Sequence, residues 1–412
     1  MQIDNNSAQN RQDSGSLPAG KVVFFSSCPE PWGGSEELWS GAAVQLRWSG
    51  HQILLYKTLV EFDHPRIKSL VEVGITVEDF YRTPAVNMQR ARRMANRILP
   101  HRYRLRMGYG TYEACVNRVR AGNFDYAIIA QGENFDGLPF VQVCRELNLP
   151  YFMICQKASD QNWPPDNLRG IVREAYTGAI RSFFVSEHNL KLTQEQIGAD
   201  LVNAEVVRNP YLTRISGPVE FPSNDDGVCR LACVGRLFVA EKGQDILLRV
   251  LAMDKWRNRP IQVSFFGKGC HSEALQDFAR DLGLVNVRFC GFSNNVTEIW
   301  NDHHALVLAS RAEGLPLVVV ESMMCGRLAI VTNVGGNTEV IDDNETGFIA
   351  DGACVASFDQ ALERSWQARE RWPEMGLEAA RRIRTMVSED PCGYLAARLI
   401  ELSNKAIGQT HS

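Results

Sequence analysis

Short apolar segments alternate with helix-length segments along most of the chain. A first series of six such segments lies at residues 21–27, 52–58, 126–132, 151–157, 182–187 and 204–210. They are unbroken apolar runs, as in KVVFFSS at residues 21–27, rather than alternating ones. Strands that are apolar on both faces and are separated by helices belong to parallel sheets covered on both sides. The pattern predicts a doubly wound, Rossmann-like α/β domain over residues 21–208.

The same pattern begins again in the second half of the chain. This second series of six apolar segments lies at residues 230–237, 261–267, 285–292, 304–310, 327–333 and 346–351. Residues 209–227, which separate the two series, are rich in Pro, Gly, Ser and Asp and predict a linker. We expect a second Rossmann-like domain at residues 228–388, facing the first across a cleft. The polar residues 1–20 predict a disordered lead-in.

Composition and charge restrict the classes of function. A chain of 412 residues that is 45% hydrophobic exceeds one core and fits several domains. A net charge of −4 provides no chain-wide basic field, which argues against a nucleic-acid partner. The chain contains no run of about 18 apolar residues of the kind that spans a membrane. The 11 cysteines lie mostly in apolar runs without zinc-ligand spacing, which predicts reduced core residues in a cytoplasmic protein.

Ligands of such sheets bind at the carboxyl ends of the strands, so the loops that follow strands are the candidate sites. In SSCPEPWGGSEELW, Gly33 and Gly34 precede a helix that Ser35 can cap, with Glu36 and Glu37 in its first turn. A glycine pair lets the backbone approach a ligand, and free helix N–H groups suit a phosphate. An ordinary tight turn with capping explains the same residues.

A second loop after a strand carries two basic residues. VGRLFVAEKG sets Arg236 after a strand and Lys242 at the start of the next helix, where two cations can neutralise a diphosphate. The alternative to diphosphate binding is that both cations are ordinary solvated surface charges.

The loop FFGKGCHSEAL lacks the third glycine of the dinucleotide fingerprint, and Arg288 stands where that fingerprint needs an acid. A nicotinamide cofactor is therefore disfavoured, and we expect no bound cofactor.

The stretch RAEGLPLVVVESMMCG carries two carboxylates in apolar surroundings. We expect Glu313 in the loop after the strand at 304–310, Pro316 at the helix start, Glu321 inside the helix and Gly326 at its end. A carboxylate buried in an apolar helix needs a partner that donates hydrogen bonds to it. The hydroxyls of a sugar or a ribose are such donors.

These motifs together resemble family four of the retaining GT-B glycosyltransferases, also called glycosyl transferases group 1. The resemblance rests on the Gly-Gly loop, Gly-Arg-Leu with a following Lys-Gly, Glu-x7-Glu, and VTNVGGNTEVIDDNETGFI. It implies the GT-B fold, an acceptor-binding first domain, a nucleotide-sugar-binding second domain and a final helix, residues 389–412, that crosses back to the first domain. It also implies a hexosyltransferase that retains the anomeric configuration. The chain contains no Asp-x-Asp motif, consistent with diphosphate binding without a metal.

The resemblance implies a role for each matching residue. Arg236 and Lys242 would bind the diphosphate of a UDP- or GDP-sugar, and Glu313 would contact the donor sugar beside the reacting atoms. The remaining donor contacts would come from Glu321 on the ribose, from Gly314, Leu315 and Leu317 on sugar and phosphate, from Gly34 on the diphosphate, and from Gly291, Phe292 and Ser293 along the base.

The sequence departs from the family pattern at three places. Gln156 and Lys157 stand where members commonly carry a histidine, and Gln156 is a candidate sugar contact. RNPYL replaces the usual Pro-Asn-Gly, which makes Asn209 a second candidate sugar contact. Pro316 has no N–H to offer a phosphate.

A basic segment lies in the first half of the chain. Residues 82–120 contain ten arginines and one acid, Glu113, and Arg90, Arg93 and Arg97 lie off an apolar helical face. The segment can be a solvated helix packed on the core, an element that draws the protein to anionic lipid at the inner face of the plasma membrane, or a site for an anionic acceptor.

We expect an enzyme of cell-envelope or exopolysaccharide assembly that uses a glycan or a lipid-linked acceptor. Two alternatives remain: a nucleotide-sugar epimerase of the same fold, and a non-catalytic nucleotide-sugar-binding or scaffold protein. The presence of Glu313 and Lys242 favours an enzyme.

Overall fold

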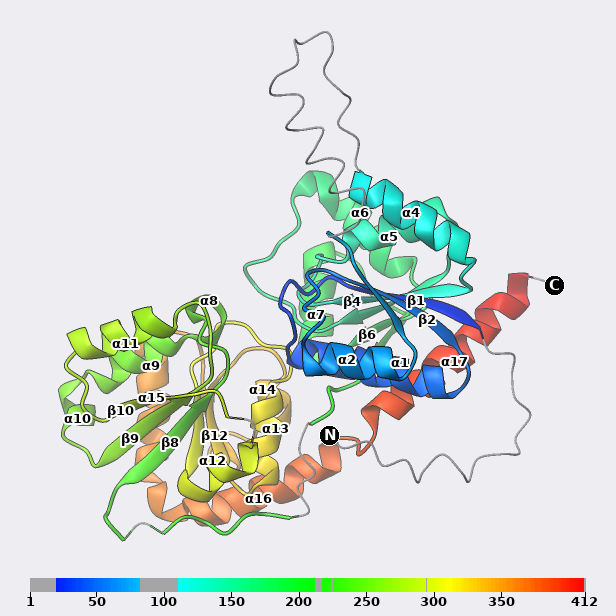
Figure 1. Cartoon of the computed structure of the whole chain (residues 1–412). Coiled ribbons are helices and arrows are strands. Elements are labelled where there is room, and N and C mark those ends of the chain that lie inside the picture. The colour runs from blue at the N-terminus through cyan, green and yellow to red at the C-terminus, as the bar shows by residue number, and fades with distance from the viewer. Residues whose placement is uncertain (1–19, 82–109, 212–216, 224, 294, 411–412) are drawn as a thin grey trace.

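The computed structural model describes residues 20–81, 110–211, 217–223, 225–293 and 295–410 (Figure 1). Its described strands form two sheets, and every strand pair within them is parallel. The seven-stranded first sheet has the order β3-β2-β1-β4-β5-β6-β7. Its strands are β1 (Lys21–Ser26), β2 (Gln52–Lys57), β3 (Thr76–Asp79), β4 (Tyr126–Gln131), β5 (Tyr151–Cys155), β6 (Ser182–Phe184) and β7 (Ala204–Val206). The six-stranded second sheet has the order β10-β9-β8-β11-β12-β13. Its strands are β8 (Cys229–Val234), β9 (Ile261–Phe266), β10 (Val287–Gly291), β11 (Ala305–Leu308), β12 (Leu328–Thr332) and β13 (Gly347–Ala350).

Helices follow most strands in both domains. The first domain contains η2 (Gly34–Glu36), α1 (Glu37–Trp48), α2 (Pro65–Glu72), α4 (Gly110–Gly122), α5 (Leu138–Glu146), α6 (Asp166–Thr177) and α7 (Glu187–Ile197). The second domain contains α8 (Val239–Lys242), α9 (Gln244–Leu251), α10 (Asp254–Arg257), α11 (Ser272–Asp281), α12 (Val296–Asp302), α13 (Leu317–Met324), α14 (Asn337–Val340), α15 (Val355–Gln367), η4 (Arg369–Arg371) and α16 (Trp372–Met386). The last helix is α17 (Pro391–Thr410).

The first sheet is buried on both faces, as its unbroken apolar strands predict. Val23 and Phe25 of β1 pack in one core cluster with residues of α4, α5 and α6. Val22 and Phe24, which point to the opposite face, pack in another cluster with α1 and α17. The second sheet and its helices share one large cluster. The predicted α/β fold of two Rossmann-like domains is therefore confirmed.

All twelve predicted strands are present, but the sequence analysis missed β3. Its sequence, TVED, contains a single apolar residue, and only one of its four residues is buried. β3 forms the edge of the first sheet, where one flank has no strand neighbour. Such an edge strand does not need the continuous apolar run by which the others were recognised.

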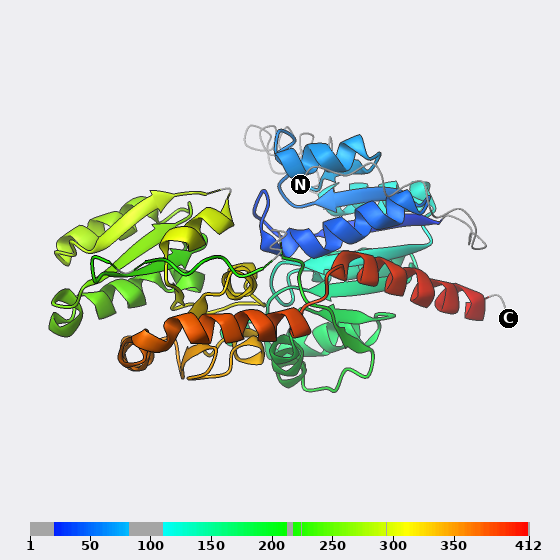
Figure 2. The same ribbon diagram turned by 90° about the horizontal axis from the view of Figure 1, so that it is seen from below.

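The chain returns to the first domain at its C-terminal end. Figure 2 shows α16 and α17 following one another along one side of the molecule, from the second domain to the first. Leu395, Leu399 and Leu402 of α17 are buried against α1 and the first sheet. The core of the first domain thus includes residues from the end of the chain. None of the helices in the described part of the chain is both long enough and apolar enough to cross a bilayer.

The cysteines differ in part from the prediction. Seven of them are buried, but Cys270, Cys290 and Cys354 are exposed and Cys392 is half-buried. The exposed three lie in loops or at the end of the edge strand β10, where an apolar run in the sequence does not lead into the core. All 11 are free thiols, and within the described residues no three Cys, His, Asp or Glu side chains lie together as metal ligands.

Candidate functional site

The loops at the carboxyl ends of the two sheets meet at the domain interface. A Cβ atom added to Gly314, in the loop after β11, would lie 2.1 Å from the carbonyl oxygen of Gln156, which follows β5 in the first domain. A Cβ atom on Gly34 would lie 3.2 Å from Cδ1 of Leu317, the first residue of α13. Because glycine has no Cβ, it permits this close approach at both places. The interface therefore brings together residues that the sequence assigns to the donor site.

Glu313 and Lys242 form a close ion pair at the centre of this region. Lys242 Nζ lies 2.6 Å from Oε1 and 2.8 Å from Oε2 of Glu313. Ser310 Oγ donates to Oε1 of the same carboxylate at 2.7 Å. The Glu313 side chain is 6% exposed and that of Lys242 is 20% exposed. The pair is thus largely shielded from water, yet its cation can still be reached.

Local structure explains why Lys242 lies so close to the loop after β11. Lys242 is the last residue of the short helix α8, and not at the start of the following helix as expected, because the next residue breaks the helix. That residue, Gly243, has a φ of +58°, and a Cβ there would lie 1.9 Å from the carbonyl oxygen of Ala309. The end of α8 is therefore pressed against the end of β11. Arg311 reinforces the contact through two hydrogen bonds, of 2.7 and 2.9 Å, to Asp245.

Arg236 lies in an ion-pair network that joins the two domains. Its guanidinium pairs with Glu30 of the first domain and, at 2.8 Å, with Glu241 of the second. Lys157 of the first domain reaches the other oxygen of Glu241 at 2.7 Å. Burial would raise the pKa of the Glu241 carboxyl, but Lys157 and Arg236 outweigh this effect and lower its pKa. Glu241 therefore remains an anion held between cations of both domains.

Glu321 is buried in α13, as predicted. It is the fifth residue of the helix and is 4% exposed. Pro316 is the N-cap residue of α13, and Gly326, just beyond the helix, has a φ of +78°, which matches the predicted start and stop. Leu315 is buried beside them.

The predicted base-binding segment lies at the end of β10, an edge strand. Gly291 has a φ of +72°, and Phe292 is 63% exposed. Ser293 Oγ accepts a hydrogen bond from the backbone N–H of Asn295. The segment offers an exposed aromatic face at the carboxyl edge of the second sheet, on which a flat ring can stack.

The two candidate sugar contacts are buried polar side chains with unused hydrogen-bonding groups. Gln156 is 3% exposed, and within the described residues neither atom of its amide group has a hydrogen-bond partner. Asn209 is 7% exposed, and its Oδ1 likewise has no partner there. A buried amide without partners is costly, so such groups suit a site that a polar ligand completes. Lys157, the other residue at the histidine position, is already engaged by Glu241.

The glycine loop of the first domain, residues 28–34, differs from the prediction in how the following helix is capped. The helix begins with the 3₁₀ turn η2, whose N-cap is Gly33, and Ser35 makes no capping hydrogen bond. Ser35 cannot cap because it already lies within that turn, and its hydroxyl faces Cys28 Sγ at 3.6 Å. Glu36 and Glu37 lie in the first turns of η2 and α1, as predicted, and both are buried and bonded to other side chains.

Two groups of functional interest were missed by sequence reasoning. The first consists of Glu30 and Glu241: Glu30 pairs with Arg236 across the interface, and Glu241 pairs with it from within the second domain. The second is the buried pair of Lys57 and Glu36 behind the glycine loop. A basic residue ending the strand QILLYK was the available signal for the second group. Arg90, Arg93 and Arg97 of the basic segment lie outside the described residues.

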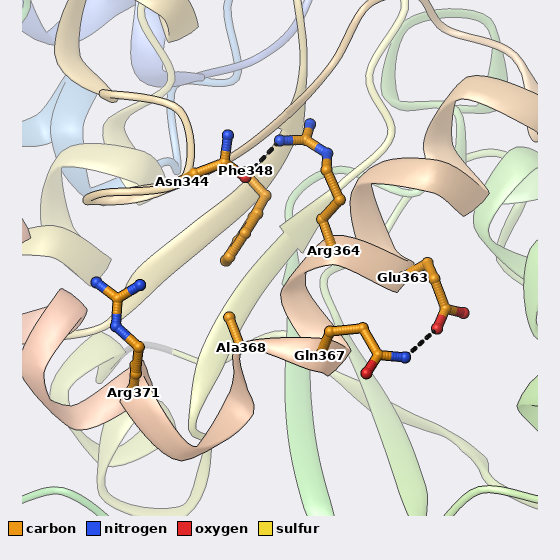
Figure 3. A pocket seen from close by; sticks show the side chains of 7 residues that line it. All are labelled: Asn344, Phe348, Glu363, Arg364, Gln367, Ala368 and Arg371. Carbon is orange, nitrogen blue, oxygen red and sulfur yellow. Dashed lines mark hydrogen bonds between the residues drawn. The ribbon is translucent and has the colours of Figure 1, made fainter.

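Two cavities in the described residues lie away from this interface. The larger, of about 480 Å³, is lined by the start of β13, the end of α15 and the following turn (Figure 3). Arg364 points to Asn344 and Gln367 to Glu363 within it. Because α15 runs back from the carboxyl end of β13, this cavity is at the opposite edge of the sheet. The smaller, of about 250 Å³, lies beside the linker at Phe221 and Arg327. Ligands of parallel α/β sheets bind at the carboxyl edge, so the interface is the better candidate site.

Comparison with known proteins finds relatives that match the second domain. Residues 229–367 match the family model of glycosyl transferases group 1. A putative glycosyltransferase EpsD of Bacillus subtilis is 30% identical over 138 residues, which are 33% of this chain and 36% of the relative. A GDP-mannose-dependent alpha-(1-6)-phosphatidylinositol monomannoside mannosyltransferase of Mycobacterium tuberculosis is 30% identical over 158 residues, which are 35% of this chain and 40% of the relative. The chain thus spans well under half the length of these curated relatives.

Solved structures resemble the whole chain. Anabaena Alr3699/HepE in complex with UDP-glucose aligns with 93% of this chain and 99% of its own, with a TM-score of 0.69 and 16% identity. Sucrose-phosphate synthase from Thermosynechococcus elongatus aligns with 94% of this chain and 100% of its own, with a TM-score of 0.70 and 13% identity. The chain has the GT-B fold that the sequence predicts.

Proposed function

We propose that this protein transfers a hexose from a nucleotide-diphosphate donor to a glycan or lipid-linked acceptor, because residues 229–367 match the family model of glycosyl transferases group 1. The observation that carries the proposal is the shielded Lys242–Glu313 pair with Ser310, at the carboxyl edge of the second sheet and facing the first domain. Relatives or neighbours are named for GDP-mannose and for UDP-glucose, so both UDP- and GDP-sugars are candidate donors.

The donor diphosphate would be bound by two cations from the second domain. Arg236 pairs with the carboxylates of Glu30 and Glu241, and Lys242 pairs with that of Glu313; an incoming diphosphate would exchange with a carboxylate at each cation. Charge-assisted bonds of this kind are roughly twice as strong as neutral hydrogen bonds, and they strengthen further when water is excluded. This arrangement needs no metal ion, because the two side chains supply the positive charge.

Release of Lys242 to the phosphate would free the Glu313 carboxylate for the sugar. A carboxylate accepts hydrogen bonds at two oxygens, and sugar hydroxyls are donors. Ser310 holds one of these oxygens at 2.7 Å and so fixes the orientation of the group. Glu321 in α13 would accept hydrogen bonds from the ribose hydroxyls. The side-chain amides of Gln156 and Asn209 would form hydrogen bonds with the sugar. The remaining contacts would be made by Gly34, Gly314, Leu315, Leu317, Gly291, Phe292 and Ser293.

We expect transfer with retention of the anomeric configuration. The acceptor would attack on the face from which the diphosphate departs, and a phosphate oxygen would take the acceptor proton as the bond to the sugar breaks. Arg236 and Lys242 would stabilise the negative charge that develops on that phosphate. Closure of the domains would exclude water and favour transfer over hydrolysis.

The proposed setting is cell-envelope or exopolysaccharide assembly, at the cytoplasmic face of the membrane. The basic segment with Arg90, Arg93 and Arg97 would attract anionic lipid at about 1 kcal/mol per basic residue near the surface. Co-sedimentation with anionic liposomes should weaken when these three arginines become Glu. Unchanged sedimentation would instead favour a helix packed on the core.

The proposed activity is tested by incubating the protein with a panel of UDP- and GDP-sugars and measuring nucleotide release. We expect slow hydrolysis of one or a few donors, with the sugar first released as the anomer present in the donor. Lys242→Met should lower this rate by about 10²-fold or more, whereas Lys405→Met on the exposed end of α17 should not change it. The absence of nucleotide release with every donor would indicate a scaffold, and an epimerised nucleotide-sugar would indicate an epimerase.

A further inference from the structure

Lys57 is a fully buried cation behind the glycine loop of the first domain. It is the last residue of β2 and is 0% exposed. Its ammonium donates to the carbonyl oxygens of Cys28, at 2.9 Å, and Glu30, at 2.8 Å, and lies 3.4 Å from Oε1 of Glu36. Two of its three partners are therefore main-chain groups of the loop between β1 and η2.

Among the described residues, residues 28–32 of this loop form no backbone–backbone hydrogen bonds. Cys28 and Glu30 each precede a proline, and Pro29 and Pro31 have no N–H to donate. A proline also keeps the preceding residue in an extended conformation, so the two carbonyl groups cannot enter a helical turn. A side-chain donor that reaches both carbonyls replaces the missing backbone bonds, and Lys57 is that donor.

The loop is the part of the first domain that faces the proposed diphosphate site. The Glu30 carboxylate pairs with Arg236 of the second domain. Gly34, at the other end of the loop, lies against Leu317 at the start of α13. A shift of the loop would therefore change the surroundings of Arg236 and the approach of Gly34 together.

Burying the charge of Lys57 costs free energy that an apolar side chain at this position would not cost. Burying an ammonium costs several kcal/mol of hydration free energy, which a well-placed partner can offset. Glu36 provides that pairing and is itself 0% exposed, with a second bond from Ser26 Oγ at 2.9 Å. Burial raises the pKa of Glu36, and the Lys57 ammonium opposes that rise. The buried Lys57–Glu36 pair thus bonds Ser26 at the end of β1 and Cys28 and Glu30 of the loop that follows.

We propose that Lys57 is a positioning residue, which fixes the backbone of residues 28–34 so that Glu30 and Gly34 meet the diphosphate site of the second domain. The inference rests on the proposed function in that the site is a diphosphate site. Residues 28–34 and 57 lie outside the segment that matches the family model.

The test separates the carbonyl contacts from the charge pair. Lys57→Met removes the ammonium but leaves Glu36 buried without a cation, so that variant alone can fail to fold. The double variant Lys57→Met/Glu36→Gln removes both charges and leaves the two carbonyls unbonded. Glu36→Gln alone is the matched control: it removes one charge, its amide oxygen can still accept from the ammonium, and both carbonyl bonds from Lys57 remain.

Two measurements decide the outcome. Hydrogen–deuterium exchange of the peptide that spans residues 27–36 should rise in the double variant and remain near wild type in Glu36→Gln. Calorimetric titration with UDP and GDP should show binding about ten-fold weaker in the double variant and within about three-fold of wild type in the control. In donor hydrolysis, KM should rise more than kcat falls, because the loop acts through binding.

Unchanged loop exchange in the double variant would overturn the inference, as would equal losses of affinity in the control and the double variant. A wild-type protein that binds neither UDP nor GDP would instead remove the proposed function. In that case the exchange measurement would still decide whether Lys57 fixes the loop.

Discussion

The Lys242–Glu313 pair allows a quantitative test by a double-mutant cycle. Lys242→Met leaves the Glu313 carboxylate, which is 6% exposed, with Ser310 as its hydrogen-bond donor. Removal of one partner from a buried pair costs about 3–5 kcal/mol. Lys242 is 20% exposed, so the reverse change, Glu313→Gln, leaves a cation that water can reach. We expect it to cost about 1–2 kcal/mol.

The double variant Lys242→Met/Glu313→Gln leaves neither charge unpaired. Its free energy of unfolding should therefore fall by less than the sum of the two single losses, with a coupling energy of about 2–3 kcal/mol. Urea unfolding followed by tryptophan fluorescence and by circular dichroism measures all four proteins. Losses that add to within about 0.5 kcal/mol would show that the two side chains do not interact in solution, and would remove the geometric basis of the proposed site.

Two further predictions concern other buried charges. Arg327 is 1% exposed and donates to carbonyls that include Glu220 O and Trp300 O, each at 2.6 Å. Arg327→Met should therefore lower the free energy of unfolding by about 3 kcal/mol. A thermal unfolding midpoint equal to wild type would contradict this. Burial raises the pKa of Asp136 to about 6 from 3.8, against a hydrogen bond from Ser27 Oγ. A raised pKa means that ionisation destabilises the folded protein, so the stability of wild type relative to Asp136→Asn should fall by about 2 kcal/mol as pH rises from 4 to 6. Urea unfolding across that pH range would refute the reasoning if the difference stayed constant.

The fold was predictable because its main signal is local. Unbroken apolar runs of strand length, separated by helix-length segments, are required of any strand that is covered on both faces. β3, TVED, was missed because an edge position relaxes that requirement. Strand ends were less well predicted: β6 stops at Phe184, although the apolar run continues to Val185. Hydrogen bonds to neighbouring strands, rather than hydropathy, determine where a strand ends.

The second-domain side of the site was also predictable in part. Arg236, Lys242 and Glu313 follow strands of one parallel sheet, and the carboxyl ends of such strands share one edge. The direct pairing of Lys242 with Glu313 could not be read from spacing, since it depends on how closely Gly243 approaches Ala309.

Contacts across the domain interface leave no local pattern in the sequence from which they could be predicted. Glu30 and Arg236 are 206 positions apart, and their pairing depends on the relative orientation of two domains. Ser35 resembled an N-cap because it precedes two glutamates, but the 3₁₀ turn begins one residue earlier. Local sequence rules assume an α-helical start and cannot foresee that turn.

The return of α17 to the first domain has a consequence for biosynthesis. Leu395, Leu399 and Leu402 complete a face of the first sheet to which β1, β2, β4, β5, β6, α1 and α2 also contribute. A ribosome makes those strands hundreds of residues before it makes α17, so the nascent first domain carries an uncovered apolar face until α17 has been made. The folding of the first domain is therefore tied to the emergence of α17, and a premature stop before Pro391 would damage the domain farther from it in sequence.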